Sequence, residues 1–473
     1  MPELKINGLP VKVDEGARVL DAAELAFAEI PTLCHLKGVE PETSCMVCVV
    51  RDKTSGQMIP ACSARAVDGM DIDTECGEVQ AARRDILNLL LSEHVGDCEA
   101  PCTRICPAHL DIPLMLREIE RGSMESAGWI ARRDLAIPAT LGYVCPAPCE
   151  KGCRRRQVDE AIAIRELHRN AVEDYPAWAA EFPDAGKNAA VIGSGPAGLA
   201  SAWKLRLLGY GCTVFDEQPA AGGTLRDEVS LPVEVLDAEV ESLRQAGIVF
   251  KLGNAISLHE IAAEFDGVIF AEAEFSGTHF ADAFYAEEHK LTVKAVANGK
   301  AVAAALDRFL KGEPPDAAER FDSKIGKLRE SEVRELCKNS SAGSRQDAGG
   351  TEAARCLHCD CRKPLSCKLR KYAEQYGADQ RAFPADERQH LQLIGHNEAV
   401  VFEPGKCIKC GLCVKITKRA GAALGLTFVG RGFNTQVKIP FDETLEKGLK
   451  ETAGECVEAC PTGALAFREV EER

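Results

Sequence analysis

The chain has 473 residues, of which 45% are hydrophobic and 27% charged, so it can bury the cores of about three domains. Its 73 acidic residues outnumber the 57 Lys and Arg residues, and the net charge of −16 argues against binding to nucleic acid or to an anionic membrane. No run reaches the ~18 apolar residues of a transmembrane helix, and the first residues lack the apolar core of a signal peptide. We therefore expect a cytoplasmic protein.

The 22 cysteines are the most informative part of the composition. In a reducing compartment they indicate metal ligands and not disulfides. Eighteen of them fall into tight groups along the chain, and four stand apart: Cys76, Cys212, Cys337 and Cys456.

Residues 1–78 alternate short β patterns with one helical stretch and carry four cysteines, spaced C-x10-C-x2-C-x13-C. Four thiolates, three of them on one long loop, predict a 2Fe–2S cluster, with a zinc knuckle as the alternative. The segment resembles the β-grasp ferredoxin-like domain that begins the large iron–sulfur subunit of NADH:quinone oxidoreductase (complex I) and the iron-only hydrogenases. The predicted ligands are Cys34, Cys45, Cys48 and Cys62.

The resemblance continues into RRDILNLLLSEHVGDC, where that family places His94 and Cys98 on its next cluster. The family would then add cysteines at x2 and x5 spacings. Here the chain departs from the pattern, because Cys102 and then Cys106-Pro107 follow.

Residues 79–183 are predicted to form a helical domain that resembles the two-cluster domain of the glutamate synthase small subunit and of dihydropyrimidine dehydrogenase. The resemblance rests on CEAPCTRICPAHLDIPLMLREIERG and GYVCPAPCEKGCRRRQVDEAIAIRELHR. It implies two 4Fe–4S clusters, with a surface or capping role as the alternative for each histidine. The implied ligands are His94, Cys98, Cys102 and Cys153 for one cluster, and Cys106, Cys145, Cys149 and His168 for the other.

Residues 184–312 open with an apolar strand, a G-x-G-x-x-G turn, a helix and a second strand that ends at Asp216. This combination predicts dinucleotide binding, because the glycines let a pyrophosphate approach the helix N-terminus and the acid accepts a ribose hydroxyl. The segment resembles the FAD site of the glutamate synthase small subunit family. The implied FAD contacts are Gly193, Gly195, Pro196, Ala197, Gly198, Asp216, Gly223 and Asp282.

That family inserts an NAD(P)H-binding domain with its own glycine fingerprint, and this chain has none. The loop after Gly223 is also short. We therefore expect a truncated Rossmann-like domain that either retains FAD or has become a scaffold without it.

Residues 313–399 are predicted to be a linker followed by a four-cysteine motif, with His358 facing solvent. Four thiolates so close together predict a 4Fe–4S cluster, with structural zinc as the alternative. The predicted ligands are Cys356, Cys359, Cys361 and Cys367.

Residues 400–473 contain three cysteines at x2 spacing and a remote Cys-Pro, the pattern of a bacterial ferredoxin-type 4Fe–4S site. Cys456 is predicted to be a core thiol. The predicted ligands are Cys407, Cys410, Cys413 and Cys460.

The predicted fold class is thus multidomain α+β and α/β, and five cluster sites predict an electron relay. The resemblances imply a subunit of a multi-subunit oxidoreductase that works between an NADH/FMN-binding flavoprotein, with its thioredoxin-like 2Fe–2S companion, and a second partner. That partner would be ferredoxin, a formate dehydrogenase or a hydrogenase, and a bound FAD would allow electron bifurcation. Two alternatives stay open: a self-sufficient NAD(P)H:acceptor flavin oxidoreductase, and a zinc-stabilised scaffold.

Overall fold

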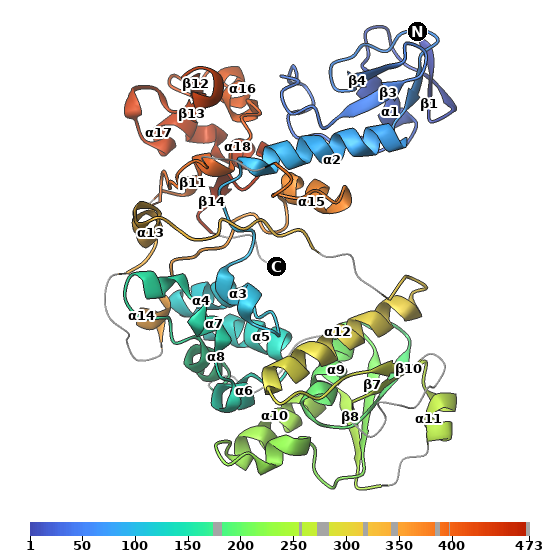
Figure 1. Ribbon diagram of the computed structural model, residues 1–473, viewed down its shortest axis with the longest axis vertical. Helices are drawn as coiled ribbons and strands as arrows, with labels where there is room; N and C mark the ends of the chain where they lie inside the picture. Colours follow the sequence, from blue (N-terminus) through green and yellow to red (C-terminus); the bar gives the residue numbers. More distant parts are fainter. Residues whose placement is uncertain are drawn as a thin grey trace. The chain divides into compact units, whose positions relative to one another are not determined.

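The computed structural model describes residues 1–173, 182–254, 258–271, 283–315, 320–341, 349–383, 388–396 and 398–469. They form two compact units, and the chain returns twice to the first unit (Figure 1). Unit 1 comprises Met1–Glu99, Glu319–Lys338 and Asp360–Arg473. Unit 2 comprises Ala100–Ala318 and Asn339–Cys359. The structure therefore groups the predicted segments differently, since it divides 313–399 between the units and joins 100–312 into one.

Unit 1 begins with a five-stranded mixed sheet in the order β2-β1-β5-β3-β4, in which only β1 and β5 are parallel. A short helix, α1 (Val19–Leu25), packs its apolar residues against the sheet to form a small core. The strands are β1 (Glu3–Ile6), β2 (Leu9–Lys12), β3 (Val49–Asp52), β4 (Gln57–Pro60) and β5 (Asp71–Asp73).

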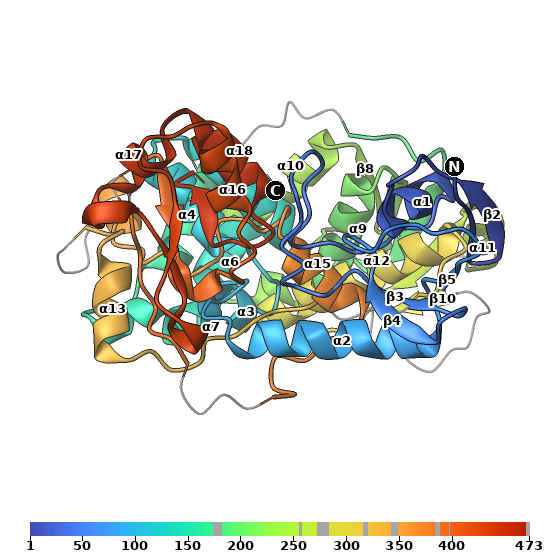
Figure 2. The ribbon, with the colours of Figure 1, turned by 90° about the horizontal axis from the view of Figure 1, so that it is seen from above.

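Helix α2 (Gly77–Ser92) lies beside β3 and β4 (Figures 1 and 2). Its buried residues Val79, Arg83, Leu87 and Leu91 recur every four positions, as expected of a helix with one apolar face. The Arg83 guanidinium donates to the Val49 carbonyl and to the Tyr376 hydroxyl at 3.0 Å. This side chain therefore ties the N-terminal sheet to the later part of unit 1.

The rest of unit 1 contains two small antiparallel strand pairs and short helices. Helix α13 lies within the stretch predicted to be a linker, and it forms there because Val333 and Leu336 are buried along one face. The strands are β11 (Val400–Phe402) with β14 (Leu465–Phe467), and β12 (Thr427–Val429) with β13 (Gln436–Lys438). The helices are α13 (Glu330–Cys337), α15 (Lys368–Gln375), α16 (Leu412–Arg419), α17 (Leu445–Leu449) and α18 (Ala453–Ala459), and the 3-10 turns are η4 (Pro404–Lys406), η5 (Gly432–Asn434), η6 (Pro440–Asp442) and η7 (Lys450–Thr452).

Unit 2 combines a helical part with a parallel sheet of order β10-β9-β6-β7-β8. The central strand β6 is buried along almost its whole length, as expected when helices cover both faces of a parallel sheet. The strands are β6 (Asn188–Ile192), β7 (Gly211–Asp216), β8 (Ile248–Leu252), β9 (Gly267–Phe270) and β10 (Ala283–Tyr285). The helices of the sheet part are α9 (Pro196–Leu207), α10 (Val233–Gln245), α11 (Leu258–Glu264) and α12 (Thr292–Leu310), with the turn η2 (Gly223–Asp227).

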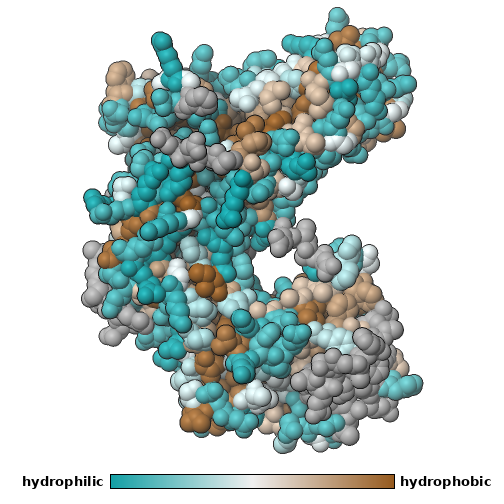
Figure 3. All heavy atoms as spheres, viewed as in Figure 1, coloured by the Kyte–Doolittle hydropathy of each residue, from teal (hydrophilic) through white to brown (hydrophobic). Residues whose placement is uncertain are grey.

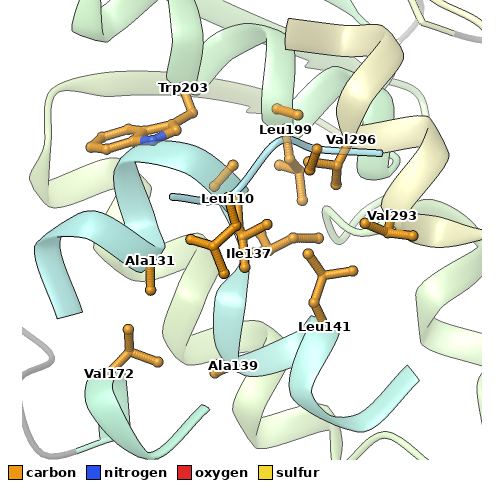
Figure 4. Packing of buried hydrophobic residues seen from close by; sticks show 14 of the residues in the cluster. Leu110, Ala131, Ile137, Ala139, Leu141, Val172, Leu199, Trp203, Val293 and Val296 are labelled. Atoms are coloured by element: carbon orange, nitrogen blue, oxygen red, sulfur yellow. The ribbon is translucent and has the colours of Figure 1, made fainter. Parts of the chain in front are cut away.

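One apolar core runs through both parts of unit 2 (Figure 4). Trp203 on α9 is fully buried, and its indole N–H donates to the Arg132 carbonyl of α5 at 2.8 Å. The predicted boundary at residues 183 and 184 therefore separates two parts of one unit. The helices of the helical part are α3 (Pro101–Ile105), α4 (Ile112–Glu120), α5 (Met124–Leu135), α6 (Pro138–Val144), α7 (Pro148–Lys151), α8 (Ile164–Glu173) and α14 (Gly350–Ala353), with the turn η1 (Arg154–Gln157).

Most of the surface seen in Figure 3 is hydrophilic. Polar side chains cover the visible face, with small apolar patches between them (Figure 3). Within the described ranges, no helix has the length and apolar character needed to cross a membrane.

Candidate metal centres and the dinucleotide fingerprint

The structure brings the four N-terminal cysteines together in the interior of unit 1. Cys34, Cys45, Cys48 and Cys62 are all at least 96% buried. Hydrogen bonds from Cys45 and Cys62 lower the pKa of Cys34, and one from Cys62 lowers the pKa of Cys48. The same hydrogen bonds raise the pKa of Cys45 and Cys62, so the four thiols are close enough to share protons. The thiolate is the form that binds metal.

The four C-terminal cysteines also converge. Cys407, Cys410, Cys413 and Cys460 line one small cavity, whose other walls are apolar side chains such as Phe402 and Val437. Burial and the other three thiols raise the pKa of Cys413. A cavity bounded by four thiols and by apolar side chains fits a cubane cluster.

A third set is assembled from residues far apart in the sequence. The Cys98 carbonyl accepts a hydrogen bond from the Cys361 amide at 3.3 Å, and the Cys98 sulfur accepts one from the Ser323 amide at 3.4 Å. Burial and the neighbouring Cys361 raise the pKa of Cys98 to about 12. Burial, Cys361 and Cys98 likewise raise the pKa of Cys367 to about 12. Cys98, Cys361 and Cys367 therefore lie together in unit 1.

Lys406 lies near both His94 and the third set. An added Cβ on Gly96 would lie 2.5 Å from Cε of Lys406, so the lysine packs on the backbone between His94 and Cys98. Burial, and then Lys406, lower the pKa of His94 to about 3, which keeps the imidazole neutral. Its Nδ1 is buried and has no hydrogen-bond partner among the described residues. A neutral nitrogen without a partner is available to a metal.

The charge beside the third set is positive. Glu403 accepts from Arg362 at 3.0 Å and from Lys406 at 2.8 Å, and all three side chains are buried. Cys361 contributes to the raised pKa of Lys406. Within this triad two cations share one carboxylate, which leaves a net charge of +1 on the triad itself.

Unit 2 holds a fourth set, also with distant members. Burial raises the pKa of Cys102, and the neighbouring Cys356, Cys153 and Cys359 raise it further. Arg355 holds the segment that carries Cys356 and Cys359, because it donates to Glu352 at 2.8 Å and to Asp159 at 2.9 Å. Cys102, Cys153, Cys356 and Cys359 all belong to unit 2.

The fifth set contains three cysteines. Burial raises the pKa of Cys149, and the neighbouring Cys106 and Cys145 raise it further. Lys300 of α12 reaches this set, since its ammonium donates to the Ala108 carbonyl at 2.6 Å.

His168 is placed at the start of α6. It is buried and hydrogen-bonds the backbone of Pro138, which begins α6, whereas Cys145 follows the end of that helix. Its Nδ1 has no hydrogen-bond partner within the described ranges. No hydrogen bond among the described residues joins His168 to the three cysteines, and its role as their fourth ligand stays a prediction.

Two predicted ligand groups are thus divided between the units. Cys98 lies in unit 1 and Cys102 in unit 2, while the four-cysteine motif contributes Cys361 to unit 1 and Cys359 to unit 2. The sequence contains a signal for this division. The spacing Cys361-x5-Cys367 is the x5 step that the complex I-like pattern lacks after Cys98.

His358 corrects a smaller expectation. The sequence predicts that it faces solvent, but it is 92% buried, with Nε2 at 3.5 Å from Glu120. Among the described residues, no three or more His, Cys, Asp or Glu side chains are placed so that they could hold a single metal ion.

Three of the thiol sets meet in one apolar cluster of unit 1. It contains Cys34 and Cys45 of the first set, Cys410 of the second and Cys367 of the third, together with Leu87 and other apolar residues. Cys34 also contributes to the raised pKa of Cys410.

The dinucleotide fingerprint has the expected backbone geometry, but a side chain of the protein lies where a dinucleotide would bind. An added Cβ on Gly198 would lie 1.9 Å from the Gly193 carbonyl, so the turn requires glycine. The place over Gly195, where a pyrophosphate would approach, holds the Glu288 carboxylate, because an added Cβ on Gly195 would lie 2.5 Å from Glu288 Oε1. The residues present therefore do not fit a bound dinucleotide. Asp282, a predicted FAD contact, lies outside the described residues.

The fold and the thiol sets define a multidomain iron–sulfur protein with a Rossmann-like domain. Residues 2–77 match the profile of the 2Fe-2S iron-sulfur cluster binding domain, and residues 92–178 match that of dihydropyrimidine dehydrogenase domain II, 4Fe-4S cluster. Residues 191–254 match the NAD(P)-binding Rossmann-like domain. The predicted mixed α/β multidomain class is confirmed at this level.

Curated relatives are oxidoreductase subunits. The chain is 35% identical over 206 residues to the NADP(+)-dependent formate dehydrogenase subunit beta of Moorella thermoacetica, covering 36% of this chain and 29% of that protein. It is 35% identical over 188 residues to the NADPH-Fe(3+) oxidoreductase subunit beta of Geobacter sulfurreducens, covering 36% and 28%. It is 32% identical over 195 residues to the glutamate synthase [NADPH] small chain of Bacillus subtilis, covering 37% and 40%.

The chain therefore spans less than a third of the first two relatives' length. The predicted resemblance to the glutamate synthase small subunit is confirmed. An NAD+-reducing [NiFe]-hydrogenase structure aligns with 99% of this chain and 87% of its own, at 12% identity and a TM-score of 0.38, a value too low to indicate a shared fold.

Proposed function

We propose that this chain is the iron–sulfur electron-transfer subunit of a multi-subunit oxidoreductase. The observation that carries the proposal is the apolar cluster of unit 1, in which thiols of three sets lie together. Centres that share one dry core exchange electrons without passing through water, and their surroundings tune the potential of each.

Each set would hold one cluster, and the clusters would supply one-electron chemistry. The proposed 2Fe–2S ligands are Cys34, Cys45, Cys48 and Cys62, and the proposed ligands of two 4Fe–4S clusters of unit 1 are His94, Cys98, Cys361 and Cys367, and Cys407, Cys410, Cys413 and Cys460. Those of unit 2 are Cys102, Cys153, Cys356 and Cys359, and the trio Cys106, Cys145 and Cys149 with one further ligand. His168, the predicted fourth ligand of the trio, is kept only as a candidate.

Apolar side chains exclude water from the thiol sets, and buried lysines place positive charge beside two of them. Leu87, Leu91 and Tyr372 cover the shared cluster of unit 1. Lys406 of unit 1 and Lys300 of unit 2 each bring a buried cation toward one set. A cation beside a cluster stabilises its reduced form, which carries more negative charge.

The partners are also part of the proposal. The relatives named above are subunits of enzymes that use NADP(+) or NADPH, and the N-terminal domain resembles the complex I large subunit. We therefore infer an NADH- or NADPH-handling flavoprotein, with a thioredoxin-like 2Fe–2S companion, on one side of the relay. Ferredoxin, a formate dehydrogenase or a hydrogenase would stand on the other side. The cytoplasm is the proposed compartment, since reduced thiols persist there.

Metal analysis of protein purified without oxygen tests the proposal. We expect about 18 iron atoms per chain, from one 2Fe–2S and four 4Fe–4S clusters, and electron paramagnetic resonance signals after reduction by dithionite. Zinc in place of iron at most sites would contradict the relay and support the scaffold. Reduction of the isolated chain by NADPH alone would instead support the self-sufficient flavin oxidoreductase.

A further inference from the structure

The fingerprint of unit 2 is closed by a side chain of the protein itself. Gly195 is the residue before α9, and the amide of Ala197 in the first turn donates to Glu288 Oε1 at 3.1 Å. The N-terminus of a helix attracts anions, which is why dinucleotide-binding proteins place a pyrophosphate there. In this chain a carboxylate supplies the anion.

The backbone of the segment that carries Glu288 is held by hydrogen bonds to two other elements. The amide of Ala286 donates to the Phe270 carbonyl of β9 at 2.7 Å, and the amide of Glu287 donates to the Asn298 side chain of α12 at 2.7 Å. The segment that carries Glu288 is thus fixed between the sheet and a helix. Burial raises the pKa of Glu288, while the Ala197 amide lowers it.

Two other predicted FAD contacts, Gly223 and Asp216, also interact with residues of the protein itself. A Cβ added to Gly223 would lie 3.0 Å from the Gly195 Cα, so the loop after β7 lies against the turn, and the Gly222 amide donates to the Ser194 carbonyl at 2.9 Å. Asp216, the predicted ribose acceptor, is 96% buried and accepts from the amides of Ser194 and Gln218, each at 2.8 Å.

We propose that the Glu288 carboxylate occupies the pyrophosphate position of the fingerprint and closes this domain to FAD and to other dinucleotides. The proposal is independent of the relay, because none of the thiol sets uses Glu288. It also accounts for the missing NAD(P)H-binding domain, since a domain that binds no flavin has no use for a neighbour that reduces it.

The Rossmann-like part of unit 2 also supports the helices that carry the predicted cluster ligands of this unit. Glu239 of α10 accepts from the amides of Ala139 and Thr140 at 2.6 and 2.8 Å and so caps α6, the helix that Cys145 follows. Lys300 of α12 reaches the carbonyl of Ala108, two residues after Cys106. The Rossmann-like part thus positions two residues of the fifth thiol set.

Flavin content and titration with FAD test the proposal on the full chain with its clusters. We expect the purified protein to contain far less than one flavin per chain and to show no saturable binding of FAD or NADPH. The variant Glu288→Ala should bind FAD at least about tenfold more tightly than the wild type. The neighbouring exposed Glu287→Ala is the matched control and should leave binding unchanged.

Two results would overturn the proposal. One is flavin near one per chain in the wild type, or saturable binding of FAD or NADPH to it. The other is a Glu288→Ala variant that keeps wild-type iron content and melting temperature but gains no affinity for FAD. Should that variant fail to fold, Glu288→Ser gives the same readout, since it removes the carboxylate from the place over Gly195 and keeps a polar side chain. Iron content reports on the relay separately, so the two proposals fail in different ways.

Discussion

The C-terminal thiol set and the dinucleotide fingerprint are both recognised by short motifs, yet the structure treats them in opposite ways. The cavity among Cys407, Cys410, Cys413 and Cys460 is bounded by thiols and apolar side chains. The place over Gly195 is taken by Glu288. A motif preserves the backbone geometry of a site, whereas the side chains that face the site decide whether a cofactor enters. Four experiments test what this contrast implies.

The largest effect is expected on the iron content of cysteine variants. Single and paired variants show which cysteines share a cluster. Cys98→Ala and Cys361→Ala should each remove about four iron atoms, because each removes a ligand of one 4Fe–4S cluster. The double variant should also lose about four, since both residues serve the same cluster. Pairing Cys98→Ala with Cys102→Ala should remove about eight. Iron analysis and paramagnetic resonance make the measurement.

Cys212→Ala is the control for this experiment, because Cys212 is a buried thiol of β7 that belongs to no set. It should leave the iron content unchanged. A loss of about eight iron atoms from the Cys98 and Cys361 pair would restore the ligand grouping predicted from the sequence.

The second effect concerns the supporting role of the sheet. Trp203→Ala should lower the free energy of unfolding of unit 2 by about 3–5 kcal/mol, because it empties the core shared by α5 and α9. Trp203→Phe keeps most of the ring and loses the hydrogen bond to Arg132, so its cost should be about 1–2 kcal/mol. Chemical denaturation followed by circular dichroism measures both. Equal stability of all three proteins would mean that the sheet does not support the helices.

The third effect is a pH dependence centred on Glu239. Burial raises the pKa of this carboxyl from 4.5 to about 7, so the folded state binds a proton more tightly than the unfolded state. Its contribution to stability is complete below about pH 4.5 and is lost as the pH rises through 7. Relative to Glu239→Gln, which does not titrate, the wild type should lose up to about 3 kcal/mol between pH 4.5 and 8. A difference that stays constant or grows with pH would contradict the assignment.

The smallest effect is expected in unit 1. Lys406→Gln should lower the reduction potential of the cluster held by Cys98 and Cys361, and Glu403→Gln should raise it. One charge nearby at an effective dielectric constant of about 20 is worth on the order of 1–2 kcal/mol, or tens of millivolts. Redox titration followed by paramagnetic resonance measures the shift. Lys447→Gln, an exposed pair partner of Glu443, should leave the potential unchanged.

The sequence predicted well what local spacing determines. The thiols of Cys407, Cys410 and Cys413 converge because x2 spacing places them on one tight turn, and the sheet around Gly193 follows from a buried strand, a glycine turn and a helix. Both patterns involve residues that are close in the chain.

Two features could not be predicted in this way. The whole of unit 2 and the segment Glu319–Lys338 of unit 1 lie between Cys98 and Cys361 in the chain, so no local spacing joins the two cysteines. Glu288 lies about 90 residues after Gly195. No sequence pattern indicates that a glutamate in a loop accepts a hydrogen bond from the N-terminus of a distant helix. Both contacts depend on tertiary packing.

The insertion of unit 2 between Cys98 and Cys361 has a consequence for biosynthesis. At translation rates of about 5–20 residues per second, the ribosome needs roughly 13–50 s to pass from one cysteine to the other. Throughout that interval the N-terminal ligands of the third set exist without their partners. With the proposed ligands, iron–sulfur delivery to this site follows synthesis of the inserted unit, while the first set, complete by Cys62, can be loaded on the nascent chain.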